Sequence, residues 1–479
     1  MKSQSRIAIL TTITLLFLGS ALSQDLKYLE YDTDLIPPSV HKARREKVLQ
    51  EIGDSSIAVF YAAPTRVRNA DVDYQYRQDD NLLYLTGFRE PDAILVLLPK
   101  GITLPNPADS SKTITTREIL FVQRRDPRRE QWTGRNYGPQ GAMQLRGLDY
   151  AATNDMFQSM LPSFRTIPGL NLIYVSAFRP DLTGQIARLL QPLRALVEQK
   201  DSTLQVKDPG QILRRMRSIK SPEEITFLTK ATDITVIAHN QAMMSLEPGM
   251  SEYEIQGVYE YVFRRMGSEF NGYPCIVGAG ENSIVLHYES NRRQIRDGDL
   301  VLADCGAEYH GYSSDVTRTY PANGKFSKPQ GEIYQIVLDA SNTAIAMIKP
   351  GVPMMRISAA VDTVLMDGLM KLGLMKKRER RELARFYMHG LGHAVGLNVH
   401  DVGGFVLQPG MLTTIEPGLY VSETLEGIDP SYRNIGVRIE DTILVTAEGH
   451  KNLSEGSPRE IADVEALMKR RGIGNQPLR

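Results

Sequence analysis

The 479-residue sequence contains only two cysteines, Cys275 and Cys305, and its 56 basic and 56 acidic side chains give a formal net charge of zero. Two thiols in a chain of this length exclude a disulfide framework. Cys305 follows an alternating strand-like run, so we expect it to be a small buried residue. The charge balance gives no indication of a polyanionic partner. The one basic cluster, at residues 124–130, is interpreted as a solvated turn rather than a nucleic-acid patch.

Long apolar runs are also scarce, and the exception is Ile7–Leu18 near the N-terminus. Two basic residues precede this run and an Ala-Leu-Ser motif ends it at residue 23, as in a secretory signal peptide. A membrane span needs about 20 apolar residues, so the run is short for that purpose. We therefore predict a signal peptide over residues 1–23, cleaved near Gln24, and a mature protein that is exported to the periplasm or secreted, without a membrane segment. An uncleaved anchor and a transit peptide are the alternatives, the second disfavoured because arginine is sparse.

The remaining sequence has an ordinary globular composition, 42% hydrophobic and 23% charged, with enough length for two or three domains. Short apolar runs at residues 55–64 and 92–99 are typical of buried strands, and residues 184–200 show helical periodicity. We predict an α/β domain over residues 24–205, a linker over 206–221, a second domain over 222–468 and a tail over 469–479.

The second domain begins with explicit helix signals. Ser221–Glu224 and Ser251–Glu254 each have the pattern of a capping box. The segment Ala238–Met250 aligns without gaps on Ala340–Val352, with five identities, and both copies end in Pro-Gly after a helical pattern. This faint repeat predicts two similar halves, each a helix pair followed by strands.

Two alternating runs flank residues 308–311 and predict a β-hairpin. Asp304 and Asp315 are equidistant from a turn centred between Tyr309 and His310, which would place the two carboxylates directly opposite each other. A centre shifted by one residue would leave them diagonal on the same face. Two ionised carboxylates this close repel unless a cation lies between them. The alternative is that one aspartate serves only a turn or cap.

Two further strand-like runs contain Glu416 and Glu440 among apolar neighbours. Arg438 shares a face with Glu440, so this buried glutamate is explained either by a salt bridge or by a bound cation. The glycine-rich segment Phe386–Gly403 adds three of the eight histidines in the chain, and its spacing is not that of an HExxH zinc helix. Four carboxylates and one histidine suit two divalent ions, with Mn²⁺ favoured over zinc by ligand type.

These segments resemble the metallopeptidases of the pita-bread fold, specifically the aminopeptidase P (Xaa-Pro aminopeptidase) branch. The resemblance is carried, in the family's order, by "IVLHYESN", "DGDLVLADCGAEYHGYSSDVTRTYPANGKF", "MHGLGHAVGLNVHDVG", "LQPGMLTTIEPGLYV" and "GVRIEDTILVT". It continues into the first domain through "YQYRQDDNLLYLTGFREPDAILVLLP". It implies an α/β (α+β) protein in which a smaller α/β N-terminal domain precedes a pita-bread catalytic domain of two pseudo-symmetric halves.

The resemblance also implies a role for each matched residue. The implied metal ligands are Asp304, Asp315, His393, Glu416 and Glu440, with Asp315 and Glu440 bridging two ions. The implied catalytic residues are His287, His389, His400, Glu416 and Arg438, and Tyr420 matches a tyrosine near the metal glutamate. For His389 and His400 the alternative is a purely local structural role, and His310 is given no role. Cys305 departs from the family, in which a small residue such as alanine is common here.

The implied reaction removes the N-terminal residue from peptides with proline second, by attack of a metal-bridging hydroxide, with Glu416 as the proton shuttle. The implied cofactors are two divalent ions, Mn²⁺ first, then Zn²⁺ or Co²⁺. Prolidase, which cleaves only dipeptides, is the nearest alternative. A metal-independent creatinase-like hydrolase and a non-catalytic pita-bread binding module are more distant ones. By analogy the chain forms a homodimer or homotetramer, and no nucleic-acid partner is expected.

Overall fold

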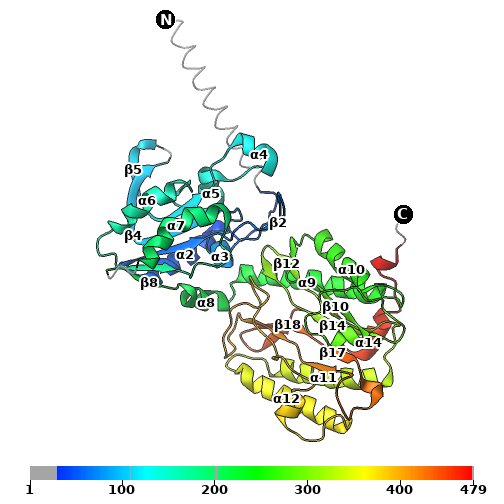
Figure 1. The fold of residues 1–479 in the computed structure, drawn as a ribbon. Coiled ribbons are helices and arrows are strands. Elements are labelled where there is room, and N and C mark those ends of the chain that lie inside the picture. Colours follow the sequence, from blue (N-terminus) through cyan, green and yellow to red (C-terminus); the bar gives the residue numbers. More distant parts are fainter. Residues whose placement is uncertain (1–29, 108, 200–202, 477–479) are drawn as a thin grey trace. The chain divides into compact units, whose positions relative to one another are not determined.

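The computed structural model describes residues 30–107, 109–199 and 203–476, so the predicted signal peptide lies outside the described residues. The chain divides into two compact units, Met1–Leu213 and Arg214–Arg479 (Figure 1). The division falls inside the predicted linker, where the chain forms helix α8 (Gly210–Ser218). Within the described ranges, no helix has both the length and the apolar character needed to cross a bilayer.

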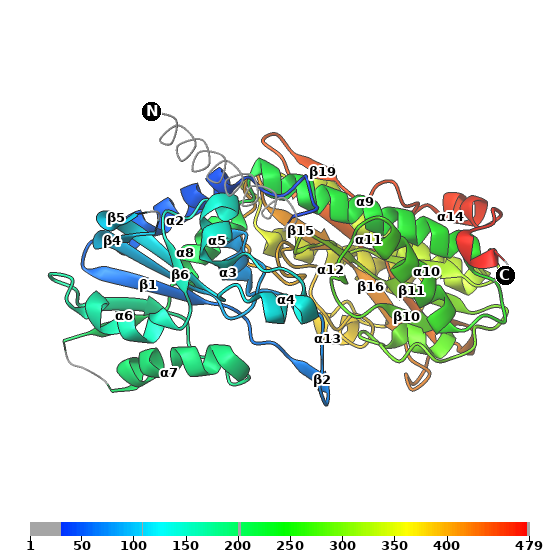
Figure 2. The same ribbon diagram turned by 90° about the horizontal axis from the view of Figure 1, so that it is seen from above.

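The first unit is built on a six-stranded mixed sheet in the order β6-β5-β4-β1-β7-β8. Its strands are β1 (Ser56–Tyr61), β4 (Ile94–Asn106), β5 (Asp109–Val122), β6 (Ala151–Thr153), β7 (Leu172–Val175) and β8 (Gln205–Lys207). Helices cover both faces, with α2 (Pro38–Ile52) on one side and α6 (Met156–Arg165) and α7 (Gly184–Glu198) on the other (Figure 2). All of β1 is buried, as its apolar run predicts. The strands predicted at 55–64 and 92–99 and the helix predicted at 184–200 are confirmed.

The rest of this unit consists of α3 (Asp80–Thr86), α4 (Pro127–Thr133), α5 (Gly138–Arg146) and the small hairpin of β2 (Val67–Asn69) and β3 (Val72–Asp73). The basic cluster at 124–130 does not form the predicted turn, because it leads into helix α4. Asp126 caps this helix by accepting a hydrogen bond from the Arg128 N–H at 2.9 Å, and Pro127 fits its first turn. No residue of α4 is buried, so the predicted solvation is confirmed.

The second unit contains two long helix pairs: α9 (Pro222–Ser245) with α10 (Glu252–Arg265), and α11 (Lys328–Met347) with α12 (Met354–Lys371). The capping box at the start of α9 is confirmed, since the Ser221 N–H donates to Glu224 Oε2 at 3.0 Å and the Glu224 N–H donates to Ser221 Oγ at 3.4 Å. The matching Pro-Gly stops hold Gly249 at φ +99° and Gly351 at φ +83°, which only glycine adopts readily.

Each helix pair precedes a three-stranded antiparallel sheet, β10-β11-β14 in the first half and β15-β18-β19 in the second. The remaining strands form the smaller sheets β13-β12-β9 and β16-β17. Figure 1 shows the strands between the green pair α9–α10 and the yellow pair α11–α12. One hydrophobic core, which includes Ile234, Val301, Val337 and Ile443, joins both pairs to both sheets. The predicted two-halved catalytic domain is therefore confirmed.

The strands of the second unit are numbered in chain order. They are β9 (Phe270–Asn271), β10 (Ile276–Ala279), β11 (Leu300–Asp304), β12 (Ala307–Tyr309), β13 (Tyr312–Ser313), β14 (Thr317–Pro321), β15 (Leu412–Ile415), β16 (Gly418–Val421), β17 (Ile435–Arg438), β18 (Asp441–Val445) and β19 (His450–Asn452). Short helices lie at η1 (Gly280–Ile284), α13 (Arg380–Leu383), η2 (Pro430–Tyr432), α14 (Ile461–Leu467) and η3 (Ile473–Asn475).

The segment predicted as a C-terminal tail contacts the end of α9 through Gly472 and Gly474. The Gly472 N–H donates to the Met244 carbonyl and the Gly474 N–H donates to Ser245 Oγ, each at 2.9 Å. The packing is too close for a side chain, because a Cβ on Gly472 would lie 2.7 Å from the Gln241 carbonyl oxygen. The C-terminal segment therefore packs as part of the second unit as far as η3.

Candidate metal centre and active site

The two aspartates come together through an irregular hairpin. His310 (φ +51°) and Gly311 (φ +87°) are the central turn residues, and Tyr309 pairs with Tyr312. The turn centre is thus one residue later than the position first predicted. His310 and Gly311, rather than Tyr309 and His310, are the two central residues, because glycine adopts the left-handed conformation readily. Asp304 consequently pairs with Thr317 instead of facing Asp315 directly. The aspartates lie diagonally on one face, as the shifted register predicts.

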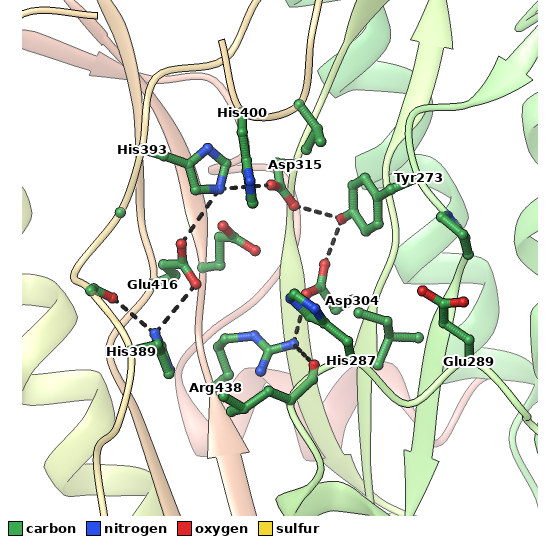
Figure 3. Close-up of a pocket in the computed structure, with 17 residues that line it drawn as sticks. Tyr273, His287, Glu289, Asp304, Asp315, His389, His393, His400, Glu416 and Arg438 are labelled. Atoms are coloured by element: carbon green, nitrogen blue, oxygen red, sulfur yellow. Dashed lines mark hydrogen bonds and ion pairs between the residues drawn. The ribbon is translucent and has the colours of Figure 1, made fainter. Parts of the chain in front are cut away.

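Tyr273 fixes the distance between these two carboxylates. Its hydroxyl lies 2.5 Å from both Asp304 Oδ1 and Asp315 Oδ1 (Figure 3). A phenol has one hydrogen, so it can donate to only one carboxylate at a time. Sequence reasoning missed Tyr273, which lies in an irregular segment between β9 and β10 without a local pattern to mark it. Its role depends entirely on the tertiary arrangement.

The second half of the domain supplies the remaining predicted ligands. His393 Nε2 lies 3.3 Å from Asp315 Oδ2 and 3.5 Å from Glu416 Oε1. One ligand atom each from Asp315, His393 and Glu440 lie within 4.8 Å of one another. Glu440 Oε2 also accepts a hydrogen bond from Thr317 Oγ1 at 2.8 Å. The structure therefore brings together residues that are up to 136 positions apart, counting from Asp304 to Glu440.

Strand ends and one close backbone contact determine this geometry. Asp304 is the last residue of β11, Glu416 follows β15, and Glu440 lies between β17 and β18. His393 is held beside β15, since the Thr414 N–H donates to its carbonyl at 2.8 Å. Gly392 permits this approach, because a Cβ there would lie 2.1 Å from the Thr414 carbonyl oxygen.

The carboxylates of Asp304, Asp315, Glu416 and Glu440 form an acidic cluster that the surrounding side chains do not fully neutralise. Burial and the neighbouring carboxylates raise the pKa of both Asp315 and Glu440 well above the ordinary range. Burial, followed by the charge of Glu440, raises the pKa of Glu416 to about 8. His393 Nδ1 lies 3.2 Å from the Ala394 carbonyl, and donation there leaves the Nε2 lone pair facing carboxylate oxygens. A cluster of oxygen donors with one imidazole aimed at them fits divalent cations.

Arg438 does not form the salt bridge with Glu440 that the sequence left open. Its Nη2 instead donates to Asp304 Oδ2 at 2.6 Å, and its Nε donates to Thr317 Oγ1 at 3.2 Å. The guanidinium is buried, with 3% of its side-chain surface exposed. Glu440 therefore lacks an arginine partner in the described structure, which leaves cation binding as the explanation for its burial.

A chain of hydrogen bonds connects Arg438 to His389. Arg438 Nη1 donates to the Tyr420 hydroxyl at 2.9 Å, and this hydroxyl donates to His389 Nε2 at 2.7 Å. His389 Nδ1 donates in turn to the Gly390 carbonyl at 2.8 Å. Burial lowers the pKa of His389 to about 4, so the ring is neutral near pH 7 with a defined tautomer.

The other two predicted histidines line the open part of the site. Together with the ligand set, His287 and His400 line a cavity of about 380 Å³. The His400 ring packs against His393 with centroids 4.0 Å apart. Burial, and then the charge of His393, lowers the pKa of His400. His310 is not among the residues that line this cavity, and its Nδ1 lies 3.0 Å from Glu269 Oε1.

His400 is positioned by a buried ion cluster that sequence reasoning missed. Asp401, the next residue, accepts from Arg217 Nη2 at 2.5 Å, and Lys220 Nζ lies 3.7 Å from its other oxygen. The three side chains are at most 7% exposed. Lys220 lies in the predicted linker, and no local pattern pairs it with a residue 181 positions later.

Both cysteines are free and buried, and Cys305 is the small buried residue predicted.

Comparisons with known proteins agree with this architecture. Residues 226–447 match the family model described as metallopeptidase family M24, and residues 41–168 match the aminopeptidase P N-terminal domain. The chain is therefore an M24 metallopeptidase in which the catalytic domain follows an N-terminal domain of the aminopeptidase P type.

More particular matches come from whole proteins. Xaa-Pro aminopeptidase of Escherichia coli is 38% identical over 438 residues, covering 89% of this chain and 96% of its own, and human Xaa-Pro aminopeptidase 3 is 37% identical, covering 87% and 81%. The solved structure of E. coli aminopeptidase P with the inhibitor Pro-Leu matches with a TM-score of 0.81 at 37% identity, over 91% of this chain and 98% of that one. The chain belongs to the Xaa-Pro aminopeptidase family.

Proposed function

We propose that this protein removes the N-terminal residue from peptides with proline in second position, using two divalent metal ions held by Asp304, Asp315, His393, Glu416 and Glu440. The observation that carries the proposal is the convergence of these five side chains on one cavity. Members of the family with this overall architecture are named for the same activity. All five positions are filled by competent ligands, which argues against a non-catalytic binding module.

When bound, the two cations would polarise the scissile carbonyl and activate water at neutral pH. Glu416 is the residue suited to move the proton. Its Oε1 lies 3.5 Å from His393 Nε2 and its Oε2 lies 3.7 Å from His389 Nδ1, so one oxygen can face a cation while the other accepts and returns a proton. It would pass that proton to the proline nitrogen as the peptide bond breaks.

The chain from Arg438 through Tyr420 to His389 holds the rest of the site in place. Arg438 neutralises Asp304 and keeps the Tyr420 hydroxyl donating to His389. His287 and His400 face the cavity with ring nitrogens that can bind substrate oxygens, and either can donate to the oxygen that gains charge during attack.

Mn²⁺ is the metal we propose first, because four of the five ligands are carboxylates, with Co²⁺ or Zn²⁺ as substitutes. A zinc-substituted form of the E. coli relative has been solved in complex with product. Metal analysis of the purified protein, with turnover measured after chelation and return of each metal, tests this choice.

The residue pattern at 1–23 supports export to the periplasm or secretion, and we propose a homodimer or homotetramer by analogy with the family. N-terminal sequencing of the protein from cell fractions tests the cleavage site near Gln24. Light scattering on the purified protein tests the assembly.

The deciding experiment compares residues 24–479 with the Asp315→Asn variant on Arg-Pro-Pro peptide and on Xaa-Pro dipeptides. Release of the first residue from the tripeptide by the wild type, and its loss in the variant, is the expected result. An exposed acid outside the site, Glu426, provides the matched control as Glu426→Gln. Cleavage of dipeptides alone would assign the protein as a prolidase, and wild-type turnover by Asp315→Asn would refute the ligand set.

A further inference from the structure

We propose that Glu289 is a specificity-determining residue that selects peptides carrying a basic side chain, lysine or arginine, at the first or the third position, on either side of the second-position proline. This inference rests on the proposed function and names the substrate class more closely. Glu289 lines the same cavity as the ligand set, yet it takes no part in the acidic cluster. Its side chain is exposed.

The segment that carries Glu289 is anchored from behind. His287 and Glu289 both line the cavity, while Tyr288 between them contacts Glu252, its hydroxyl donating to Glu252 Oε2 at 2.8 Å. Glu252 is fully buried and also accepts from the Arg293 N–H at 2.8 Å. The carboxylate of Glu289 is thus presented from a fixed backbone, which reduces the entropy lost on binding a ligand.

The nearby arginines are engaged elsewhere. Arg293 Nη1 pairs with Asp299 Oδ2 at 2.5 Å, and the Arg293 guanidinium also pairs with Glu281 at 2.9 Å. The Arg292 guanidinium lies over the Tyr253 ring, 5.6 Å from its centroid. Among the residues that the structure describes, none forms an ion pair or hydrogen bond with the Glu289 carboxylate. A charged oxygen pair at the cavity therefore remains available to a cation from outside the chain.

The surroundings favour the side chain of a peptide over a metal ion or the substrate amino group. Figure 3 shows Glu289 on the opposite side of the cavity from His393 and Glu416, with His287 between it and the acidic cluster. The α-amino group is one carbon from the scissile carbonyl and so belongs beside the cluster. The apolar lining residues Ile276 and Leu286 suit the aliphatic stem of lysine or arginine, whose charged end would reach Glu289.

The test uses tripeptides with proline second that differ only in charge, arginine against citrulline and lysine against norleucine, placed first or third. We expect wild-type kcat/KM to favour the basic peptide by about fivefold in one of the two positions, the upper range of an exposed ion pair. Glu289→Gln should bring this ratio close to one, and Glu289→Lys should invert it. The preference should also shrink in about 1 M salt, where the screening length is about 3 Å. The position that shows the preference identifies which side of the scissile bond Glu289 serves.

Glu426→Gln, which removes one exposed charge away from the cavity, is the control and should keep the wild-type ratio. A wild-type ratio near one at both positions would overturn the inference. So would an equal loss on basic and neutral peptides in Glu289→Gln, because that outcome places the substrate amino group at Glu289. Failure of the proposed function is distinguishable, since then no neutral Xaa-Pro-Yaa peptide is cleaved by the wild type. Thermal midpoints of all three variants, Glu289→Gln, Glu289→Lys and Glu426→Gln, verify that they fold.

Discussion

Replacing one buried ligand should stabilise the metal-free protein while it removes the response to metal. Glu440 is 1% exposed, and a ligand atom of Asp315 lies within 4.8 Å of one of its oxygens. In the metal-free form burial raises the pKa of both groups, followed by the charge of Asp304 at Asp315 and by the charge of Asp315 at Glu440. The substitution Glu440→Gln keeps the shape and the acceptor for Thr317 but removes the charge.

The magnitude follows from Coulomb's law. Two unit charges 4.8 Å apart, the upper limit for these ligand atoms, interact by about 3 kcal/mol at an effective dielectric constant of about 20. For a unit of this size a change of 1 kcal/mol shifts the melting temperature by about 2–4 °C. Metal-free Glu440→Gln should thus melt about 6–12 °C above the metal-free wild type at pH above 8, where the carboxylates are most strongly forced to ionise.

Scanning calorimetry of chelated protein, with and without added Mn²⁺, measures both parts of this prediction. The wild type should gain stability with Mn²⁺ by mass action, and the variant should gain little. Glu426→Gln should behave as the wild type in both forms. If metal-free Glu440→Gln melts below the metal-free wild type, or if it keeps the full Mn²⁺ response, then Glu440 is not a repelled metal ligand.

Three further outcomes are expected. Burial raises the pKa of Glu416 from 4.5 to about 8, so between these pH values the folded metal-free protein holds a proton that the unfolded chain releases. The free energy of unfolding should therefore fall as pH rises from 4.5 to 8. Urea titrations should show a weaker fall in Glu416→Gln. Tyr420→Phe should lower kcat by about tenfold, because the Arg438 and His389 groups lose a shared buried partner and an unpaired group costs about 1–3 kcal/mol; an unchanged kcat on a Xaa-Pro-Yaa peptide would contradict this. Ser221→Ala should lower the free energy of unfolding by about 1 kcal/mol through loss of the cap on α9, while Ser221→Asp should retain most of it.

The site is assembled from strand ends, and this explains why charged groups are tolerated in the interior. Asp304 and Glu416 lie directly at the ends of β11 and β15, where the backbone pairing stops and side chains turn into the cavity. Regular pairing within the same strands buries the apolar residues that stabilise the domain. The stability of the core can thus offset the repulsion within the acidic cluster until cations bind.

Local features of the sequence determined much of the secondary structure. The cap at Ser221 is made within three residues, and the Pro-Gly stops at Gly249 and Gly351 follow from the backbone preferences of proline and glycine, so both could be predicted without knowledge of the fold. The apolar alternation around Asp304 and Asp315 also indicated a shared face. The ligand identities followed from segments that resemble one metallopeptidase family in order and spacing.

Only the tertiary structure decided which distant groups meet. The partner of Arg438 is Asp304 rather than its near neighbour Glu440, and Tyr273 bridges carboxylates 31 and 42 residues away. The pairing of Arg217 with Asp401 likewise spans 184 residues. Such contacts are set by how sheets and helices pack, because side-chain direction at a strand end depends on neighbours that no local periodicity encodes.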